Sequence, residues 1–140
     1  MSEPNGLIYN CGTFKVDNLD IRNNTTKLVN QGKAYIEETH TRCTIENGCY
    51  LEVEDFDGVL RLGELSSATI ETYNKNRGDN PDLTLGKNSI LNIEKAYLTE
   101  EHFHGPSNGY ALVKIEEVEQ LNNFQSAGNI YYEIKEFDDD

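Results

Sequence analysis

The sequence has 140 residues, of which 36% are hydrophobic and 26% are charged, and its formal net charge at pH 7 is −13. This hydrophobic content is too high for a disordered segment, and the length suits one hydrophobic core, so we expect residues 1–140 to form a single domain. No apolar stretch approaches the roughly 20 residues that a membrane-spanning helix needs. The composition therefore predicts a soluble protein with no membrane partner.

The acidic excess is concentrated in two parts of the chain. Residues 44–72 contain seven acidic residues and one basic residue, and residues 94–140 contain eleven acidic and three basic residues. A field of this sign repels phosphate backbones, which argues against direct nucleic-acid binding through a basic groove. It favours a protein partner with a basic surface, and the alternatives are a bound cation or a role in solubility alone.

The N-terminal residues and the cysteines indicate a reducing compartment. Residues 1–6 lack the basic and apolar regions of a signal peptide, which predicts a cytoplasmic protein, or a virion protein if the chain is encoded by a phage. Cys11, Cys43 and Cys49 are odd in number and have no C-x-x-C spacing. They predict reduced thiols rather than a disulfide framework or a zinc ribbon.

Turn signals recur along the chain at intervals of eight to twelve residues, with alternating hydrophobic and polar residues between them. This pattern predicts a mainly β fold, namely an antiparallel β-sandwich or jelly-roll-like domain of short strands. No internal repeat is evident from the sequence.

Residues 50–65 carry the strongest local prediction. A type I′ turn at Asp57-Gly58 would make an antiparallel hairpin in which Val53 lies opposite Leu62 and Glu54 lies opposite Arg61. The same residues match most of an EF-hand calcium loop, but Val53 occupies the first ligand position, so the hairpin is the preferred interpretation.

The remaining elements follow in chain order. Residues 74–82 are polar and predict the longest loop. Residues 89–98 fit both a helical and a strand pattern, and the strand is preferred. A strand at 110–115, one short helix near 115–123, a strand that includes Ile130, Tyr132 and Ile134, and an acidic tail at 138–140 complete the prediction.

The chain has few groups that could support catalysis. His102 and His104 would share one face of a strand, a geometry that small β-barrel metalloenzymes use to bind a metal, but the sequence supplies no nearby third ligand. We interpret them as exposed loop residues and weak metal candidates. No nucleophile elbow or phosphate-binding glycine loop is present, so no catalytic residue and no cofactor is predicted.

These observations favour a non-enzymatic binding or assembly protein, of the kind found as a structural or accessory subunit of a virus or phage. It would make protein–protein contacts and could form a homo-oligomer. An acidic inhibitor or immunity protein that occupies the basic groove of a nucleic-acid enzyme is the first alternative, and a metal-dependent β-barrel enzyme is the second. The residues predicted to bind the partner are Glu116, Glu117, Glu119, Asp138, Asp139 and Asp140.

Overall fold

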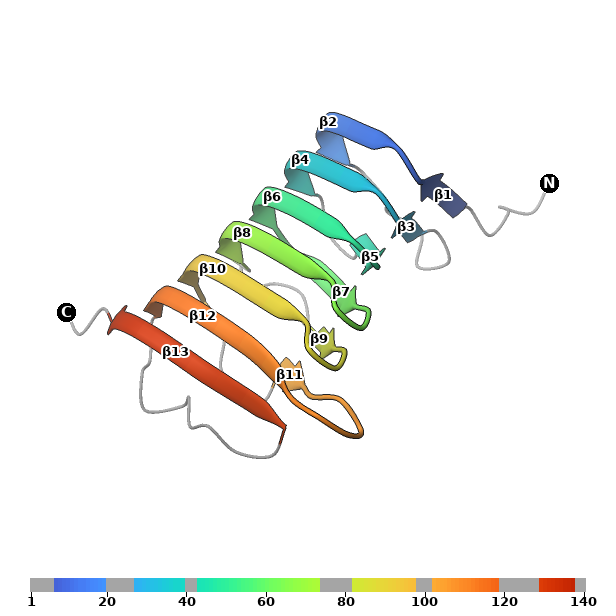
Figure 1. Ribbon diagram of the computed structural model, residues 1–140. Helices are drawn as coiled ribbons and strands as arrows, with labels where there is room; N and C mark the ends of the chain where they lie inside the picture. Colours follow the sequence, from blue (N-terminus) through green and yellow to red (C-terminus); the bar gives the residue numbers. More distant parts are fainter. Residues whose placement is uncertain are drawn as a thin grey trace.

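The computed structural model describes residues 7–19, 27–39, 43–73, 82–97, 102–118 and 129–137, and these form a parallel β-solenoid of stacked coils (Figure 1). Each of the first six coils contributes a short strand followed by a long strand, and the described part of the seventh consists of one long strand. The short strands are β1 (Leu7–Asn10), β3 (Lys27–Asn30), β5 (Cys43–Asn47), β7 (Gly58–Leu62), β9 (Asp82–Leu85) and β11 (Phe103–His104). The long strands are β2 (Thr13–Leu19), β4 (Lys33–Thr39), β6 (Tyr50–Phe56), β8 (Ser67–Tyr73), β10 (Ile90–Ala96), β12 (Ala111–Val118) and β13 (Ile130–Phe137).

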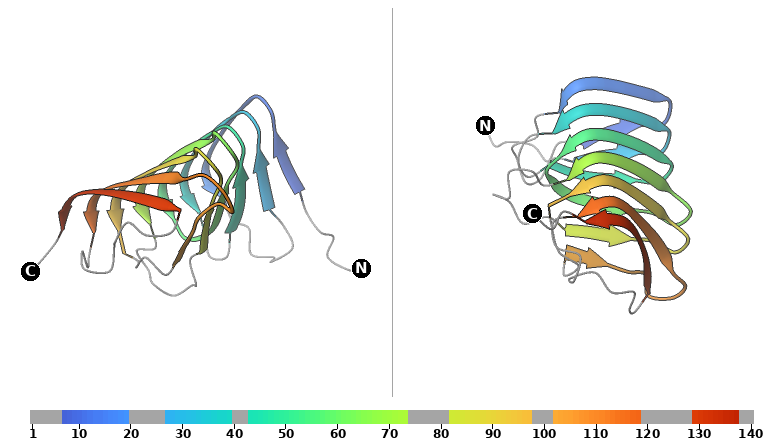
Figure 2. Two further views of the ribbon diagram at one scale, coloured as in Figure 1. Left: turned by 60° about the horizontal axis from the view of Figure 1, so that its bottom comes forward. Right: turned by 90° about the vertical axis from the view of Figure 1, so that its left-hand side faces the viewer.

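The two kinds of strand form two separate parallel sheets. The short strands pair in the order β1-β3-β5-β7-β9-β11, and the long strands pair in the order β13-β12-β10-β8-β6-β4-β2. The chain thus passes from one sheet to the other at every corner and never forms a hairpin between the strands described. Figure 2 shows the coils stacked along one axis with the sheets meeting at an angle. Among the described residues, no helix is long and apolar enough to cross a membrane.

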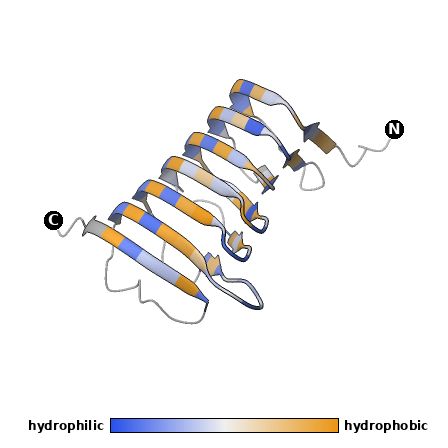
Figure 3. Cartoon of the chain, in the orientation of Figure 1, coloured by the Kyte–Doolittle hydropathy of each residue, from blue (hydrophilic) through white to orange (hydrophobic). Residues whose placement is uncertain are grey.

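The core consists of rows of inward-facing residues, each of which stacks on the equivalent residue of the next coil. In the long-strand sheet one row contains Val16, Ile36, Val53, Ile70, Ile93, Ile115 and Ile134. In the short-strand sheet a second row contains Ile8, Leu28, Ile45, Leu60, Leu83 and Phe103. β-branched and aliphatic side chains suit this arrangement because they pack well on a pleated surface. Figure 3 shows the resulting hydrophobic and hydrophilic bands, which line up from coil to coil.

An asparagine ladder fixes the corner between the short and long strands of the first three coils. Asn10 Nδ2 donates to Asn30 Oδ1 at 2.8 Å, and Asn30 Nδ2 donates to Asn47 Oδ1 at 2.7 Å. Asn30 Nδ2 also donates to the Tyr50 carbonyl oxygen of the next coil at 2.8 Å. Asn30 is fully buried, so these bonds satisfy polar groups that would otherwise be costly to remove from water.

The corners of the fourth and fifth coils are stabilised by a serine hydroxyl instead of an asparagine side chain. Asn47 Nδ2 ends the ladder by donating to the Ser67 carbonyl oxygen at 2.9 Å. The hydroxyl of Ser66 then donates to the Gly63 carbonyl oxygen at 2.7 Å, and Ser89 makes the same bond to Gly86 at 2.7 Å. A Gly-x-x-Ser turn therefore takes the place of the corner asparagine in the fourth and fifth coils.

The predicted antiparallel sandwich or jelly-roll-like fold is wrong. Alternating hydrophobicity reports only that one strand face is buried, and it is the same for antiparallel strands and for the stacked parallel strands found here. The turn signals were placed correctly in several cases, including Gln31-Gly32, Asn47-Gly48 and Gly86–Asn88. They mark corners at which the chain changes sheet, however, and the coils constitute the internal repeat that was not evident from the sequence.

The predicted hairpin at residues 50–65 is also wrong. Strand β6 pairs with β4 and β8, whereas β7 pairs with β5 and β9 in the other sheet. Asp57 lies at the corner between them, where its backbone N–H donates to Thr39 Oγ1 at 2.9 Å. Arg61 contacts Glu46 rather than Glu54, with 3.3 Å between Nη1 and Oε2. The Asp-Gly pair thus turns the chain between sheets instead of folding a strand back on its neighbour.

The other predicted elements have mixed outcomes. The strands expected within 89–98, 110–115 and around Ile130 are confirmed as β10, β12 and β13. The helix near 115–123 is wrong for residues 115–118, because they continue β12 with Ile115 in the core row. Residues 119–123, the loop at 74–81 and the tail at 138–140 lie outside the described residues.

Replacing Asn30 by Ala should destabilise the fold much more than replacing Asn10 by Ala. N30A leaves Asn47 Oδ1 and the Tyr50 carbonyl without their buried donor, which should cost about 3 kcal/mol. Asn10 is only half-buried in the first coil, so N10A should cost about 1 kcal/mol. Urea unfolding measures both values, and equal losses would show that the ladder does not depend on burial.

Gly32→Ala should destabilise the protein, whereas Gly12→Ala should leave it nearly unchanged. A Cβ at Gly32 would lie 2.8 Å from the Cys11 carbonyl carbon and still closer to Gly12 O, because the preceding coil packs directly against it. A Cβ at Gly12 meets nothing within 4 Å. Overpacking of this kind costs about 1–3 kcal/mol. A melting temperature that falls equally in both variants would contradict the close coil stacking at Gly32.

Candidate functional site

The long strands share a local irregularity near their ends, where two consecutive residues face outward. In β6, Glu54 and Asp55 are both exposed, and they lie between buried Val53 and buried Phe56. An ideal strand alternates strictly, so two outward residues in succession require the strand to bend. Figure 2 shows the far ends of the long strands turning away from the rest of the sheet. Two successive positions that are not buried also occur near the ends of β2, β4, β8, β10 and β12.

The first of the two outward positions is acidic in six successive coils. The residues are Asp17, Glu37, Glu54, Glu71, Glu94 and Glu116, and all six are exposed. The positions on either side of Glu37 and Glu54 are in register, since Ile36 pairs with Val53 and Glu38 with Asp55. Neighbouring strands lie about 4.8 Å apart, so the six positions form a row about 24 Å long across the sheet. We call this set the acidic column.

On the short-strand face, charged side chains are arranged differently, in pairs of opposite sign. There Glu46 Oε2 contacts Lys27 Nζ at 2.8 Å and Arg61 Nη1 at 3.3 Å, and His104 Nε2 lies 3.0 Å from Asp82 Oδ1. Opposite charges thus alternate between neighbouring coils on this face, which is the favourable arrangement for paired strands. The acidic column repeats one sign instead, and like charges on neighbouring strands destabilise a sheet.

Neighbouring carboxylates contribute to a raised pKa at two positions of the column, Glu37 and Glu71. A hydrogen bond with the Asp17 carboxyl group, together with its negative charge, raises the pKa of Glu37 above the ordinary value of 4.5. Desolvation and the charges of Glu54 and Glu94 raise the pKa of Glu71. The Lys27 hydrogen bond lowers the pKa of Glu46 on the other face. The two faces therefore hold carboxylates in opposite electrostatic conditions.

A groove of about 720 Å³ runs beside the N-terminal half of the acidic column. One side is formed by Asp17, Glu37, Glu54 and Glu71, and the other by Lys15, Tyr35, Glu52 and Thr69. Lys15 Nζ lies 5.7 Å from the centre of the Tyr35 ring, and the Tyr35 and Tyr50 rings meet edge to face at 6.1 Å. The groove thus combines a row of carboxylates with an aromatic side chain, which allows it to contact both the charged head and the apolar stem of a basic residue.

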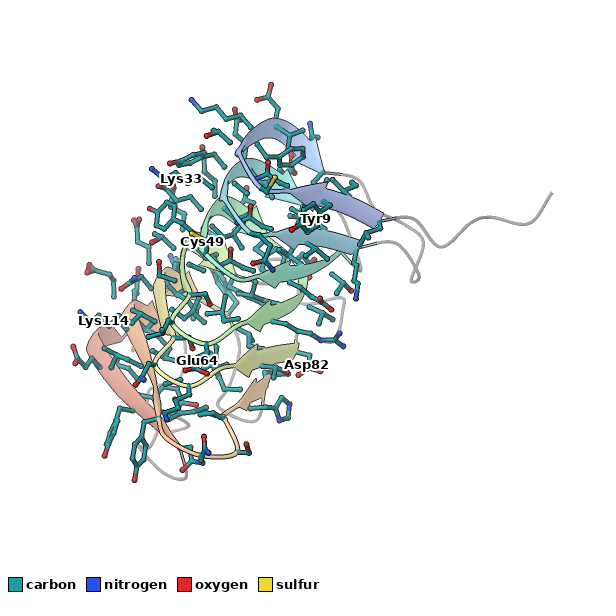
Figure 4. All side chains as sticks on the ribbon, turned by 45° about the vertical axis from the view of Figure 1, so that its right-hand side comes forward. Tyr9, Lys33, Cys49, Glu64, Asp82 and Lys114 are labelled. Carbon is teal, nitrogen blue, oxygen red and sulfur yellow. The ribbon has the colours of Figure 1, made fainter. Side chains whose placement is uncertain are left out.

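The histidines predicted as weak metal candidates do not form a complete ligand set in the described part of the chain. His104 is exposed on β11 and has one carboxylate neighbour, Asp82, while half-buried His102 precedes the strand. Among the residues that the structure places, no group of three or more His, Cys, Asp or Glu side chains could hold a metal ion. Cys11 and Cys49 are exposed free thiols at the corners of the first and third coils, and Figure 4 shows the position of Cys49.

One of the predicted partner residues lies in the acidic column. Glu116 belongs to it, and Glu117 is the second outward residue of the same bend, 3.9 Å from Lys95 Nζ. The predicted partner residues Glu119 and Asp138–Asp140 lie outside the described residues. The other five column members were missed, although each follows a core Val or Ile directly in the sequence, at intervals of 17 to 23 residues. This recurring pair of a core Val or Ile followed by an acidic residue was the sequence signal that could have identified the column.

No protein-family model, curated protein or solved structure matches the chain. The function is therefore inferred from the geometry and charge of the acidic column and the groove beside it.

Protonation of the column should stabilise the protein in mildly acidic solution. A carboxyl group whose pKa is raised in the folded state contributes stability that is complete below its unfolded value, near 4.5, and is lost as the pH rises through the raised value. The melting temperature should therefore be higher at pH 5 than at pH 7. This difference should be smaller in the E37Q/E71Q double variant. Thermal unfolding at pH 7, 6 and 5 measures this difference.

Glu46→Gln serves as the opposite control. The lowered pKa of Glu46 contributes stability above the ordinary value that is lost as the pH falls through the lowered one. At pH 7, E46Q should lose about 0.5–1 kcal/mol because its two ion pairs are partly exposed, whereas E37Q should gain stability. Loss of stability in both variants at pH 7 would contradict like-charge repulsion in the column.

Proposed function

We propose that the chain is a non-enzymatic protein-binding module and that the acidic column binds a basic surface of its partner. The observation that carries this proposal is the repetition of one acidic position through six coils, from Asp17 to Glu116. A sheet gains nothing from such a row, since cross-strand repulsion opposes it. Local features that cost stability are expected at functional sites, where a ligand compensates for them.

The contrast between the two faces supports the same proposal. If acidic residues served only solubility, alternation of charge would be as acceptable at the bend as it is around Glu46. A row of successive carboxylates instead creates a concentrated negative potential, which raises the association rate of a basic partner and fixes its orientation. The groove beside Tyr35 adds contact area for the stems of lysine and arginine side chains.

A second candidate is an inhibitor that imitates nucleic acid. The observation that favours it is convergence, because Glu54 and Glu71 from one acidic segment and Glu94 and Glu116 from the other lie in a single line. Spacing is less favourable: the column carries one charge per about 4.8 Å, against one phosphate per about 3.4 Å of axis in each DNA strand. A basic protein surface of unspecified class therefore remains the leading proposal.

The test compares two double variants that remove the same number of charges. E54Q/E71Q removes two adjacent column carboxylates, and E64Q/D82N removes two carboxylates away from the column, at the corner and on the short-strand face (Figure 4). With a fluorescent decalysine peptide as the probe, the column variant should bind about three- to tenfold more weakly than the native chain. The control should change little.

Salt provides the second measurement. Binding of the native chain should weaken as ionic strength rises from 20 to 200 mM, and the slope should be smaller for E54Q/E71Q. Equal affinities and equal salt slopes for the two double variants would mean that the probe responds to net charge alone, which would overturn the proposal.

A further inference from the structure

Incomplete burial of the core is concentrated at the two ends of the stack. Inward-facing Ile36, Val53 and Ile70 of the middle coils are at most 3% exposed. The hydrophobic residues that pack against the core but remain only partly buried are Ile8, Phe14 and Val16 of the first coil and Tyr132 and Ile134 of β13. Strands β2 and β13 end the long-strand sheet, and neither has a second partner strand among the described residues. Figure 1 shows them at opposite ends of the molecule.

The two ends match each other in register. Phe14 of β2 and Tyr132 of β13 belong to one inward row, and Val16 and Ile134 belong to the next. A second copy placed with its β2 beside β13, parallel and in the register that the sheet already uses, would therefore stack Phe14 on Tyr132 and Val16 on Ile134. This contact repeats the interaction between successive coils, and it would pair the backbone groups at both edges.

Charge complements the apolar match. The outward position between these two rows is Lys15 in β2 and Glu133 in β13, and both side chains are exposed. The same placement puts a lysine of one copy next to a glutamate of the other. The alternative symmetric contacts, β2 against β2 or β13 against β13, bring together two copies of the same end.

We infer that copies of this chain associate head to tail through β2 of one copy and β13 of the next. The partly buried rows supply the apolar area of the contact, and the sheet register aligns β2 of one copy with β13 of the next. The Lys15–Glu133 pair favours the head-to-tail orientation over the symmetric contacts. Because each copy presents one end of each kind, the contact is heterologous, and it can extend into a linear assembly in which the long-strand sheet continues from copy to copy. The acidic columns of successive copies would then fall on one line.

Charge reversal tests this inference. Sedimentation velocity at low salt should show concentration-dependent association of the native chain. Lys15→Glu alone and Glu133→Lys alone should each raise the dissociation constant roughly five- to tenfold, since each places like charges at the contact. The K15E/E133K double variant should restore association, and so should an equimolar mixture of the two single variants.

Every other pattern contradicts the head-to-tail contact. Association weakened by K15E but not by E133K indicates a symmetric contact of the β2 ends, and the reverse pattern indicates a symmetric contact of the β13 ends. A chain that remains monomeric at all concentrations shows that something other than a second copy covers these ends. Circular dichroism and thermal unfolding of each variant at low concentration establish that the monomer is folded.

Discussion

In-register stacking of parallel coils is the constraint on which the other features depend. Each residue of a coil lies about 4.8 Å from the equivalent residue of the next coil, so the character of a row depends on which residues the sequence places at that position. Where the repeated residue is Ile or Val, the row becomes core. Where it is Asn, the amide groups bond to each other, as Asn10, Asn30 and Asn47 do. Where it is Glu or Asp, the row becomes a line of repelling charge.

The same constraint explains why one molecule has two faces of different character. A residue on the short-strand face meets an opposite charge on the next coil, so Glu46 is held between Lys27 and Arg61. At the bend of a long strand, the hydrogen bond and charge of Asp17 raise the pKa of Glu37, and desolvation together with the charges of neighbouring carboxylates raises the pKa of Glu71. The difference does not come from exposure, because both faces contact solvent. It comes from which residue the sequence repeats at that position of the coil.

The sequence allowed the strands to be located more readily than their partners. β10, β12 and β13 follow from local alternation, which depends only on one buried face. Pairing depends on whether the chain reverses or crosses to another sheet after Asp57, and local residues such as Asp-Gly suit both outcomes. The coil interval also varies between 17 and 23 residues, so the repeat is hidden from a search at fixed period. For the same reason Glu116 was found as part of an acidic cluster, whereas its alignment with Glu94 and Glu71 required the register.

The bend lies at nearly the same position in successive coils, so the number of coils determines the length of the acidic column. One more coil of the same pattern would lengthen the acidic column by one carboxylate and about 4.8 Å, without altering the corner or the core of its neighbours. Length and charge therefore change together and in whole steps. The number of coils therefore sets both the length and the total charge of the acidic column.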